Sequence, residues 1–273
     1  MSKALITQSY LTNIANSIRT KLGVQTTYTP SQMSSAIDSI PTGGDDTEFL
    51  KVVEGGASSI TLPSETTQIR KYLFYEDTSL QTIDIPNSVT SIGEYAFSNC
   101  TNLVLTSLPS SLENIGNGVF RGCVNLDLTS LPSSLTSIGN GAFNGCTSLA
   151  LTSLPNSLTS IGQSAFYNCT SLALTSLPSG IKKIEGSTFG GCTSLVTMSL
   201  PNSIESVVNY AFEDCSELTT LTFEGTPSGT IGNIVFLRCT NLTTINVPWS
   251  QGAKYGAPWG ATNATINYNY TPT

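Results

Sequence analysis

The stretch Leu131-Pro-Ser-Ser-Leu-Thr-Ser-Ile-Gly-Asn-Gly-Ala-Phe-Asn-Gly-Cys-Thr-Ser-Leu149 decides the fold, because near-copies of it recur on both sides. Each copy carries one cysteine; the first six stand 23 residues apart and the last follows after 24, at Cys100, Cys123, Cys146, Cys169, Cys192, Cys215 and Cys239. Cysteines that serve catalysis, zinc or disulfides cluster at short spacings, whereas one cysteine per constant interval indicates a recurring structural unit.

Other positions repeat with the same period. A phenylalanine stands three residues before every cysteine, and Phe74 stands likewise before Asp77, which marks an eighth unit without a thiol. An isoleucine or valine and a proline recur further upstream, so the unit reads L-P-x-S-[LIV]-x-x-I-G-x-x-A-F-x-[GND]-C-T-x-L. Units shorter than 30 residues cannot bury a core alone, so we expect stacked coils that share one continuous apolar core.

Each unit has a predicted local structure. The hydroxyl-rich and β-branched segment Ser134–Ile138 suits a short strand that begins after a proline. The segment Asn140–Asn144 suits a single helical or 3₁₀ turn. The residue before each cysteine is Asn, Gly or Asp, with Arg238 as the exception, and these types tolerate a left-handed backbone.

The first and last units differ from the middle ones in one segment. Residues 80–85 and 195–200 follow L-x-x-[IM]-x-L, whereas residues 103–108 and their three successors follow L-x-L-x-x-L. Because strand side chains alternate between faces, this shift by one position predicts a changed local path within an unchanged coil length.

The two ends do not repeat. Residues 1–42 carry apolar residues at helical spacing and predict a small helical hairpin, followed by a polar linker at 43–47. The repeats occupy 48–248, and an aromatic cap or tail at 249–273 is expected to cover the last coil. The start lacks the apolar core of a signal peptide, and no run of about 18 apolar residues occurs, so we expect no membrane insertion.

Composition excludes several function classes. Charged residues are 11% of the chain, the net charge is −7, and the 11 Lys and Arg are scattered, so no basic stripe for nucleic acid exists. The chain has no histidine, which excludes Ser-His-Asp and Cys-His catalysis and histidine-bearing zinc sites. We therefore expect no enzyme, no cofactor and no metal, and we interpret the acidic pair Glu213-Asp214 as solvated.

The quoted stretch resembles the BspA-like, or Treponema-type, leucine-rich repeat, over about residues 50–248. The resemblance implies a right-handed leucine-rich-repeat solenoid with a parallel sheet. It also implies a bacterial surface or extracellular protein that adheres to or recognises a host or cell-surface protein. Tyr10–Arg19 with Tyr28–Met33, and Ala257–Tyr268, resemble parts of prophage-encoded structural proteins, which would instead place the chain on a phage particle as a receptor-recognition protein.

The candidate binding residues are aromatic. Tyr95, Tyr167 and Tyr210 lie in variable turn positions, where aromatics anchor interfaces. Trp249, Tyr255 and Trp259 either stack on a sugar, as in a carbohydrate-binding module, or pack into the C-terminal cap. Rows of hydroxyls near Thr136, Ser137, Thr159 and Ser160 either bind a ligand or only make this surface of the solenoid hydrophilic.

The cysteines are predicted to form a buried, reduced ladder. Stacked coils bring neighbouring thiols to about 5 Å, which permits a disulfide by distance, but parallel side-chain directions and an odd count argue against pairing. Each cysteine then acts as a small hydrophobic residue.

Overall fold

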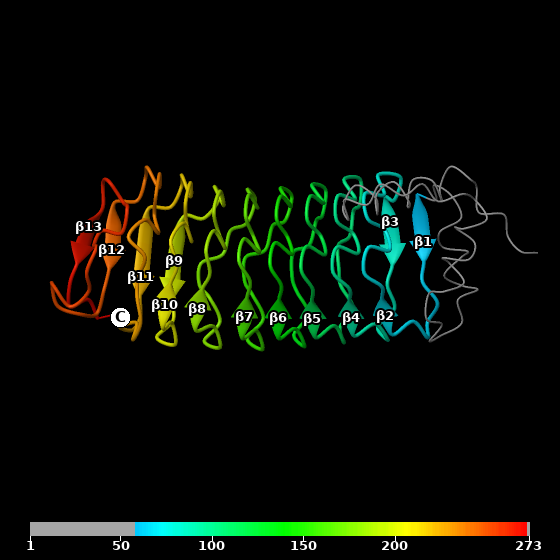
Figure 1. Cartoon of the computed structure of the whole chain (residues 1–273), viewed down its shortest axis with the longest axis horizontal. Helices are drawn as coiled ribbons and strands as arrows, with labels where there is room; N and C mark the ends of the chain where they lie inside the picture. Colours follow the sequence, from blue (N-terminus) through cyan, green and yellow to red (C-terminus); the bar gives the residue numbers. More distant parts are fainter. Residues whose placement is uncertain (1–57, 272–273) are drawn as a thin grey trace, which may run out of the picture.

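The computed structural model describes residues 58–271, and the chain winds there into a parallel β-solenoid (Figure 1). The predicted helical hairpin at 1–42 and the linker at 43–47 lie outside the described residues. Two rows of strands run along the solenoid. The lower row in Figure 1 comprises β2 (Gln68–Ile69), β4 (Ser91–Ile92), β5 (Asn114–Ile115), β6 (Ser137–Ile138), β7 (Ser160–Ile161), β8 (Lys183–Ile184) and β10 (Ser206–Val207).

The upper row is confined to the ends of the solenoid (Figure 1). It comprises β1 (Ser59–Thr61), β3 (Thr82–Asp84), β9 (Thr197–Leu200), β11 (Thr220–Phe223), β12 (Thr244–Asn246) and β13 (Thr265–Asn267). The middle units, which carry L-x-L-x-x-L, form no strand there apart from a bridge at Ser176. Their second leucine is buried all the same, as at Leu128 and Leu151, so the predicted change of local path at constant coil length is confirmed.

Equivalent residues of neighbouring coils lie side by side. In the lower row Ile92 pairs with Ile115 and Ile138 with Ile161, each 23 residues further along the chain. Every strand pairing is parallel. The sequence period is therefore the length of one coil.

A stack of phenylalanine rings forms the centre of the core. The rings run from Phe74 through Phe236, all are buried, and successive centroids lie 5.1–5.8 Å apart with planes within 26° of parallel. Offset-stacked pairs at this distance add about 0.5–1.5 kcal/mol each beyond the burial of their area. One invariant ring per unit thus holds the coils in a single register.

The turn before each cysteine is not helical, which corrects the sequence prediction. No helix occurs among residues 58–271. In residues 141–146 the backbone N–H groups alternate: those of Ala142, Asn144 and Cys146 donate within their own coil, three residues back. Those of Gly141, Phe143 and Gly145 donate to carbonyl groups of the next coil. A continuous helix is impossible because every second donor is used between coils.

Every turn but the one before Cys239 contains two left-handed residues. The residue before the cysteine has positive φ in every unit, from Asn99 (61°) to Arg238 (60°), as the residue types predicted. A second left-handed position lies four residues earlier, and it was not predicted: Tyr72, Tyr95, Gly118, Gly141, Ser164, Ser187 and Tyr210. Tyrosine and serine pay a steric penalty there that glycine avoids, so residue type does not reveal this position.

Candidate functional site

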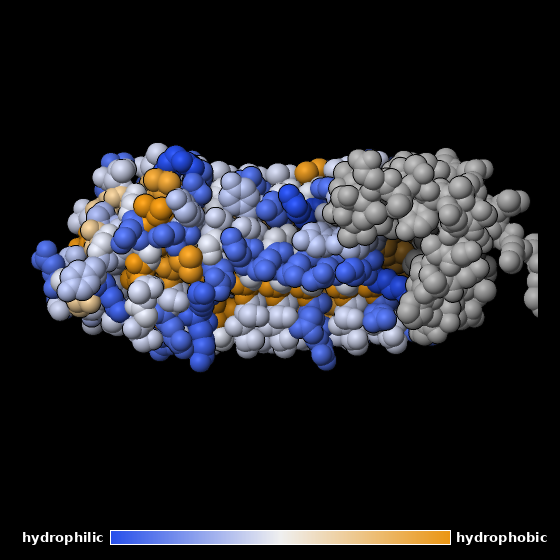
Figure 2. Space-filling view, viewed as in Figure 1, coloured by the Kyte–Doolittle hydropathy of each residue, from blue (hydrophilic) through white to orange (hydrophobic). Residues whose placement is uncertain are grey.

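A shallow groove of about 630 Å³ runs along the lower row of strands across the middle coils. Its floor is formed by the isoleucines of β5, β6 and β7 and by the glycine that follows each strand. Figure 2 shows a strip of hydrophobic surface along the middle coils, between a hydrophilic row and a paler row. This groove is the candidate functional site, because the same types of side chain line it in successive coils.

A ladder of side chains forms one wall, and we call Glu94, Asn117, Asn140 and Gln163 the amide ladder. The Asn117 amide donates to the Glu94 carboxylate at 2.8 Å. The Asn117 Oδ1 accepts the Asn140 backbone N–H at 2.8 Å, and the Asn140 Oδ1 accepts the Gln163 backbone N–H at 2.8 Å. These bonds fix the side chains at the interval of one coil and commit the amide oxygens of both asparagines. The Asn117 amide nitrogen donates to Glu94, so the Asn140 amide nitrogen is the donor that this wall offers to a ligand.

The opposite wall consists of the strand residues Asn114, Ser137 and Ser160, of which Ser137 is half-buried. The Ser137 hydroxyl donates to Asn114 Oδ1 at 2.5 Å. The neighbouring threonine hydroxyls serve the scaffold, because those of Thr136 and Thr159 donate to backbone carbonyls of the preceding coil at 3.0 and 3.1 Å. Of the predicted hydroxyl rows, the serine row thus lines the groove and the threonine row stabilises coil stacking.

The glycine after each strand is required by close approach between coils. A Cβ on Gly139 would lie 2.7 Å from both the Asn117 nitrogen and the Gly116 carbonyl carbon, and one on Gly162 would lie 2.5 Å from the Asn140 nitrogen. Real Cβ atoms do not approach backbone so closely. The glycine row therefore lets the coils stack, and its missing side chains leave the floor of the groove open.

The groove has an acidic residue at each end and no cation in its lining. Glu94 lies at one end and Glu185 at the other, where Lys183 Nζ lies 2.9 Å from the Glu185 carboxylate. Between them the lining is neutral amide and hydroxyl. Such a surface suits an extended ligand that offers hydrogen-bond acceptors along its length and basic groups at the ends.

The three predicted tyrosines lie outside the groove and are not brought together. Tyr95 stacks on Tyr72, with ring centroids 5.4 Å apart and planes 5° apart. The Tyr167 ring lies over Gly190, and Tyr210 is 39% exposed two coils beyond Tyr167. Tyr95 lines a pit of about 320 Å³ beside the groove.

The two tryptophans belong to the core. Trp249 and Trp259 are buried and pack with Phe223, with ring centroids 5.2–6.3 Å apart, and Trp259 Nε1 donates to the Tyr255 carbonyl at 2.9 Å. They cap the solenoid, and burial removes the open ring face that sugar stacking requires. Tyr255 is 93% exposed. In the same region β13 pairs with β12, so the cap adds one more strand to the upper row.

All seven cysteines are buried and free, as predicted for a reduced ladder. Each thiol donates to the carbonyl of the phenylalanine in the preceding coil, at 2.9–3.1 Å. Burial raises the pKa of the Cys123 thiol to about 12 and moves that of Cys146 in the same direction. A neutral thiol without solvent access is a poor nucleophile and metal ligand. The ladder is therefore structural.

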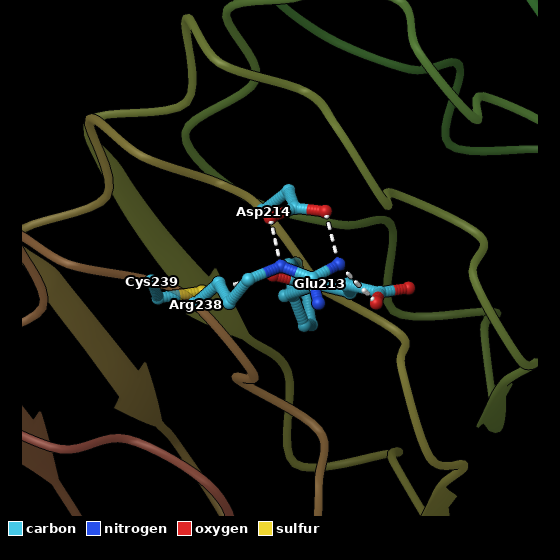
Figure 3. Close-up of polar contacts among 5 residues, drawn as sticks. Glu213, Asp214, Arg238 and Cys239 are labelled. Carbon is cyan, nitrogen blue, oxygen red and sulfur yellow. Dashed lines mark hydrogen bonds and ion pairs between the residues drawn. The ribbon is translucent and has the colours of Figure 1, made fainter.

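The acidic pair Glu213-Asp214 is not merely solvated, as the sequence suggested, but paired with Arg238 (Figure 3). The guanidinium donates to both Asp214 oxygens at 2.6 and 2.7 Å and to Glu213 Oε1 at 2.6 Å. This hydrogen-bonded guanidinium lowers the pKa of Asp214. Arg238 replaces the usual Asn or Gly before the cysteine and links its coil to the previous one.

Two further classes of feature were sought within residues 58–271. No group of three or more Cys, Asp or Glu side chains is placed to hold a metal ion there. Nor does that part of the chain contain a helix long and apolar enough to cross a bilayer.

The repeat pattern described as the BspA type leucine rich repeat region matches residues 54–173 and 159–252, in six copies. The chain belongs to this family. A comparison with curated proteins finds no significant match. The matched residues include the coils that build the groove, the stack of phenylalanine rings and the row of buried cysteines.

Solved structures agree with this assignment. The Treponema pallidum leucine rich repeat protein is 30% identical, with a TM-score of 0.51 over 69% of this chain and 79% of that one. A leucine-rich repeat protein from Bacteroides ovatus has a TM-score of 0.55 at 22% identity, over 77% of this chain and 69% of that one. The second likeness supports the fold alone, and both support a leucine-rich-repeat solenoid.

Proposed function

We propose that this chain is a non-enzymatic interaction protein that recognises a protein on a cell surface, and that the groove is its binding face. Membership in a leucine-rich-repeat family supports a role in binding proteins. The groove itself carries the proposal, because it repeats one neutral, donor-bearing wall coil after coil between Glu94 and Glu185. A regular row of this kind suits an extended protein segment better than a small compact ligand.

The experiment measures binding of the fluorescently labelled full chain to intact epithelial cells. Arginine substitutions at Ser137 and Ser160 project long side chains from the wall of the groove. The matched control is Ser153→Arg, at an exposed position on another side of the coil. We expect the S137R and S160R double variant to lose at least tenfold in binding, and the control to bind like the parent chain.

Cells treated with trypsin before the assay distinguish the partner class. Loss of binding after this treatment is expected for a protein partner. Binding that survives trypsin, or that is equal for the groove variant and the control, contradicts the proposal.

Assembly into a phage particle is the alternative function. The resemblance of both ends to phage structural proteins stays a prediction, because the family match covers only residues 54–252. Fractionation after prophage induction tests it: the chain in purified particles supports a virion role, and the chain in the cell envelope alone contradicts it. Carbohydrate binding by the aromatic tail is a further alternative, and of its candidate rings Trp249, Tyr255 and Trp259 only Tyr255 is exposed.

A further inference from the structure

The floor of the groove ends at a side chain. The middle coils carry a glycine after the strand isoleucine, as at Gly139 and Gly162, but the coil of β8 carries Glu185 at this position. A Cβ on Gly139 or Gly162 would lie 2.7 or 2.5 Å from a backbone nitrogen of the preceding coil. Strand pairing breaks at the next coil, which has such a Cβ: β7 is the last strand of one sheet, and β8 pairs with β10 in another. Glu185 therefore closes this end of the floor.

Hydrogen bonds fix the backbone of Glu185. Thr188 stands where the neighbouring coils carry Ala165 and Ala211, and its side chain is buried. The Thr188 hydroxyl lies 2.9 Å from the Glu185 carbonyl oxygen and 3.3 Å from that of Gly162, so it links the two coils at the end of the groove. The Thr188 backbone N–H also donates to the Glu185 carbonyl, at 3.3 Å. The point from which the Glu185 carboxylate extends is thus set by a buried contact.

Glu94 is the acidic residue at the other end of the lining. Its carboxylate accepts the Asn117 amide, and among residues 58–271 no ion pair includes it. Four repeats of 23 residues separate the ladder position of Glu94 from that of Gly186, which directly follows Glu185. At ~4.8 Å for each coil, Glu94 and Glu185 lie about 19 Å apart along the groove. The lining between them is uncharged.

We infer that the groove selects a protein segment with two basic side chains about six residues apart. The inference rests on the proposed function and specifies the chemistry of the partner. An extended chain advances ~3.3 Å for each residue, so six residues span about 20 Å, and each basic side chain forms charge-assisted hydrogen bonds with one carboxylate. Between them the Asn140 amide nitrogen meets a backbone carbonyl of the segment. A charge in this middle part would lose water without gaining a partner.

Lys183 already pairs with one of the two carboxylates. Its Nζ lies 2.9 Å from Glu185 Oε1, and both side chains are partly exposed. Lys183 does not belong to the groove lining, whereas Glu185 does. In the chain without its partner, Lys183 therefore takes the place that a basic side chain of the bound segment would take. Removal of this lysine should strengthen the binding of a basic segment, which a purely structural Lys183–Glu185 pair would not cause.

Binding of the full chain to synthetic peptides tests the inference. The peptides have equal length, blocked ends and a background of Ser, Thr and Ala, and they carry two lysines six residues apart, two adjacent lysines, or one lysine. Low ionic strength keeps the interactions of exposed charges measurable. We expect the spaced peptide to bind at least threefold more tightly than the other two, because its second contact forms within the complex.

Variants of the chain identify the two contacts. Glu94→Gln and Glu185→Gln should each weaken binding of the spaced peptide at least threefold, and Lys183→Gln should strengthen it. The matched controls are Glu205→Gln and Lys182→Gln, which make the same charge changes in an ion pair outside the groove lining. Both controls should bind like the parent chain. Cooperative thermal unfolding of each variant confirms that the fold is intact.

Four results would overturn the inference: no binding of the spaced peptide at millimolar concentration, equal binding of spaced and adjacent lysines, equal effects of Glu185→Gln and Glu205→Gln, or weaker binding after Lys183→Gln. Failure of the proposed function gives a different result. Loss of cell binding by the S137R and S160R double variant without any effect of lysine spacing retains the proposed function and rejects the inference. Equal cell binding by the double variant and its control refutes the proposed function, whatever the peptides show.

Discussion

Alkaline pH should destabilise the solenoid through its buried thiols. Burial raises the pKa of Cys123 from 9.0 to about 12. It raises the pKa of five others in the same direction: Cys100, Cys146, Cys169, Cys192 and Cys215. Unfolding returns each thiol to water and to its ordinary pKa. Stability is therefore fully present below pH 9 and falls between pH 9 and about 12, where the unfolded chain has lost protons that the folded chain keeps.

The magnitude follows from these two pKa values. At pH 10 a thiol in the unfolded chain is about ten times more often ionised than neutral, which favours unfolding by about 1.4 kcal/mol. Six thiols of this kind together contribute about 8 kcal/mol, which is comparable to the whole stability of a typical domain, ~5–15 kcal/mol. Removing two thiols should therefore reduce the alkaline loss by about 3 kcal/mol at pH 10.

The assay compares the parent chain with the double variant Cys146→Ala and Cys169→Ala in urea unfolding under reducing conditions. At pH 8 the variant is expected to be less stable, because two buried sulfurs and their hydrogen bonds to phenylalanine carbonyls are lost. At pH 10 the gap should narrow by about 3 kcal/mol. The two chains share every other ionisable residue, so the contributions of those residues cancel in the comparison. A gap of the same size at pH 8 and pH 10 would refute the reasoning.

Three other predictions concern the coil scaffold. Phe143→Ala should lower the free energy of unfolding by about 3–5 kcal/mol, since it removes a buried ring from the middle of the stack; a loss under 1 kcal/mol in urea unfolding would contradict this. Gly139→Ala should destabilise by about 1–3 kcal/mol, whereas Gly186→Ala, whose Cβ would have neighbours no closer than 3.5 Å, should be near neutral; equal melting temperatures for the two would count against the close-approach argument. Arg238→Gln should raise the pKa of Asp214 toward its ordinary value. In the parent chain the lowered pKa of Asp214 stabilises the fold above the ordinary pKa, and this contribution is lost as the pH falls through the lowered pKa; the variant should lack it. An unchanged NMR titration of the Asp214 carboxyl would exclude the ion pair.

The repeat made the coil architecture predictable. One phenylalanine, one cysteine and one isoleucine per 23 residues predicted the stacked core, because identical units can only bury such residues against one another. The residue types before each cysteine also predicted a left-handed backbone, since Asn, Asp and Gly adopt it at low cost. The shift from L-x-x-[IM]-x-L to L-x-L-x-x-L correctly located the units that lack the upper strand.

The rest depended on contacts between coils, which single-unit patterns do not contain. The turn at Asn140–Asn144 was predicted as helical, but alternate N–H groups donate to the next coil. The amide ladder was missed because Glu94, Asn117 and Asn140 become a row only once the coils stack. A signal was present, however: a carboxylate or amide recurs right after the Ile-Gly pair in several units.

The strict 23-residue register makes length itself a variable of this protein. Each coil contacts its neighbours through the same strand pairs, ring stack and thiol hydrogen bonds. Duplication or loss of the gene segment that encodes one coil, such as residues 124–146, would therefore preserve these contacts between all remaining coils. Each added unit would extend the groove by about 4.8 Å, the spacing of neighbouring strands. Unequal crossing-over would thus change the length of the groove, and so fit partners of different size, while the packing of the core stays the same.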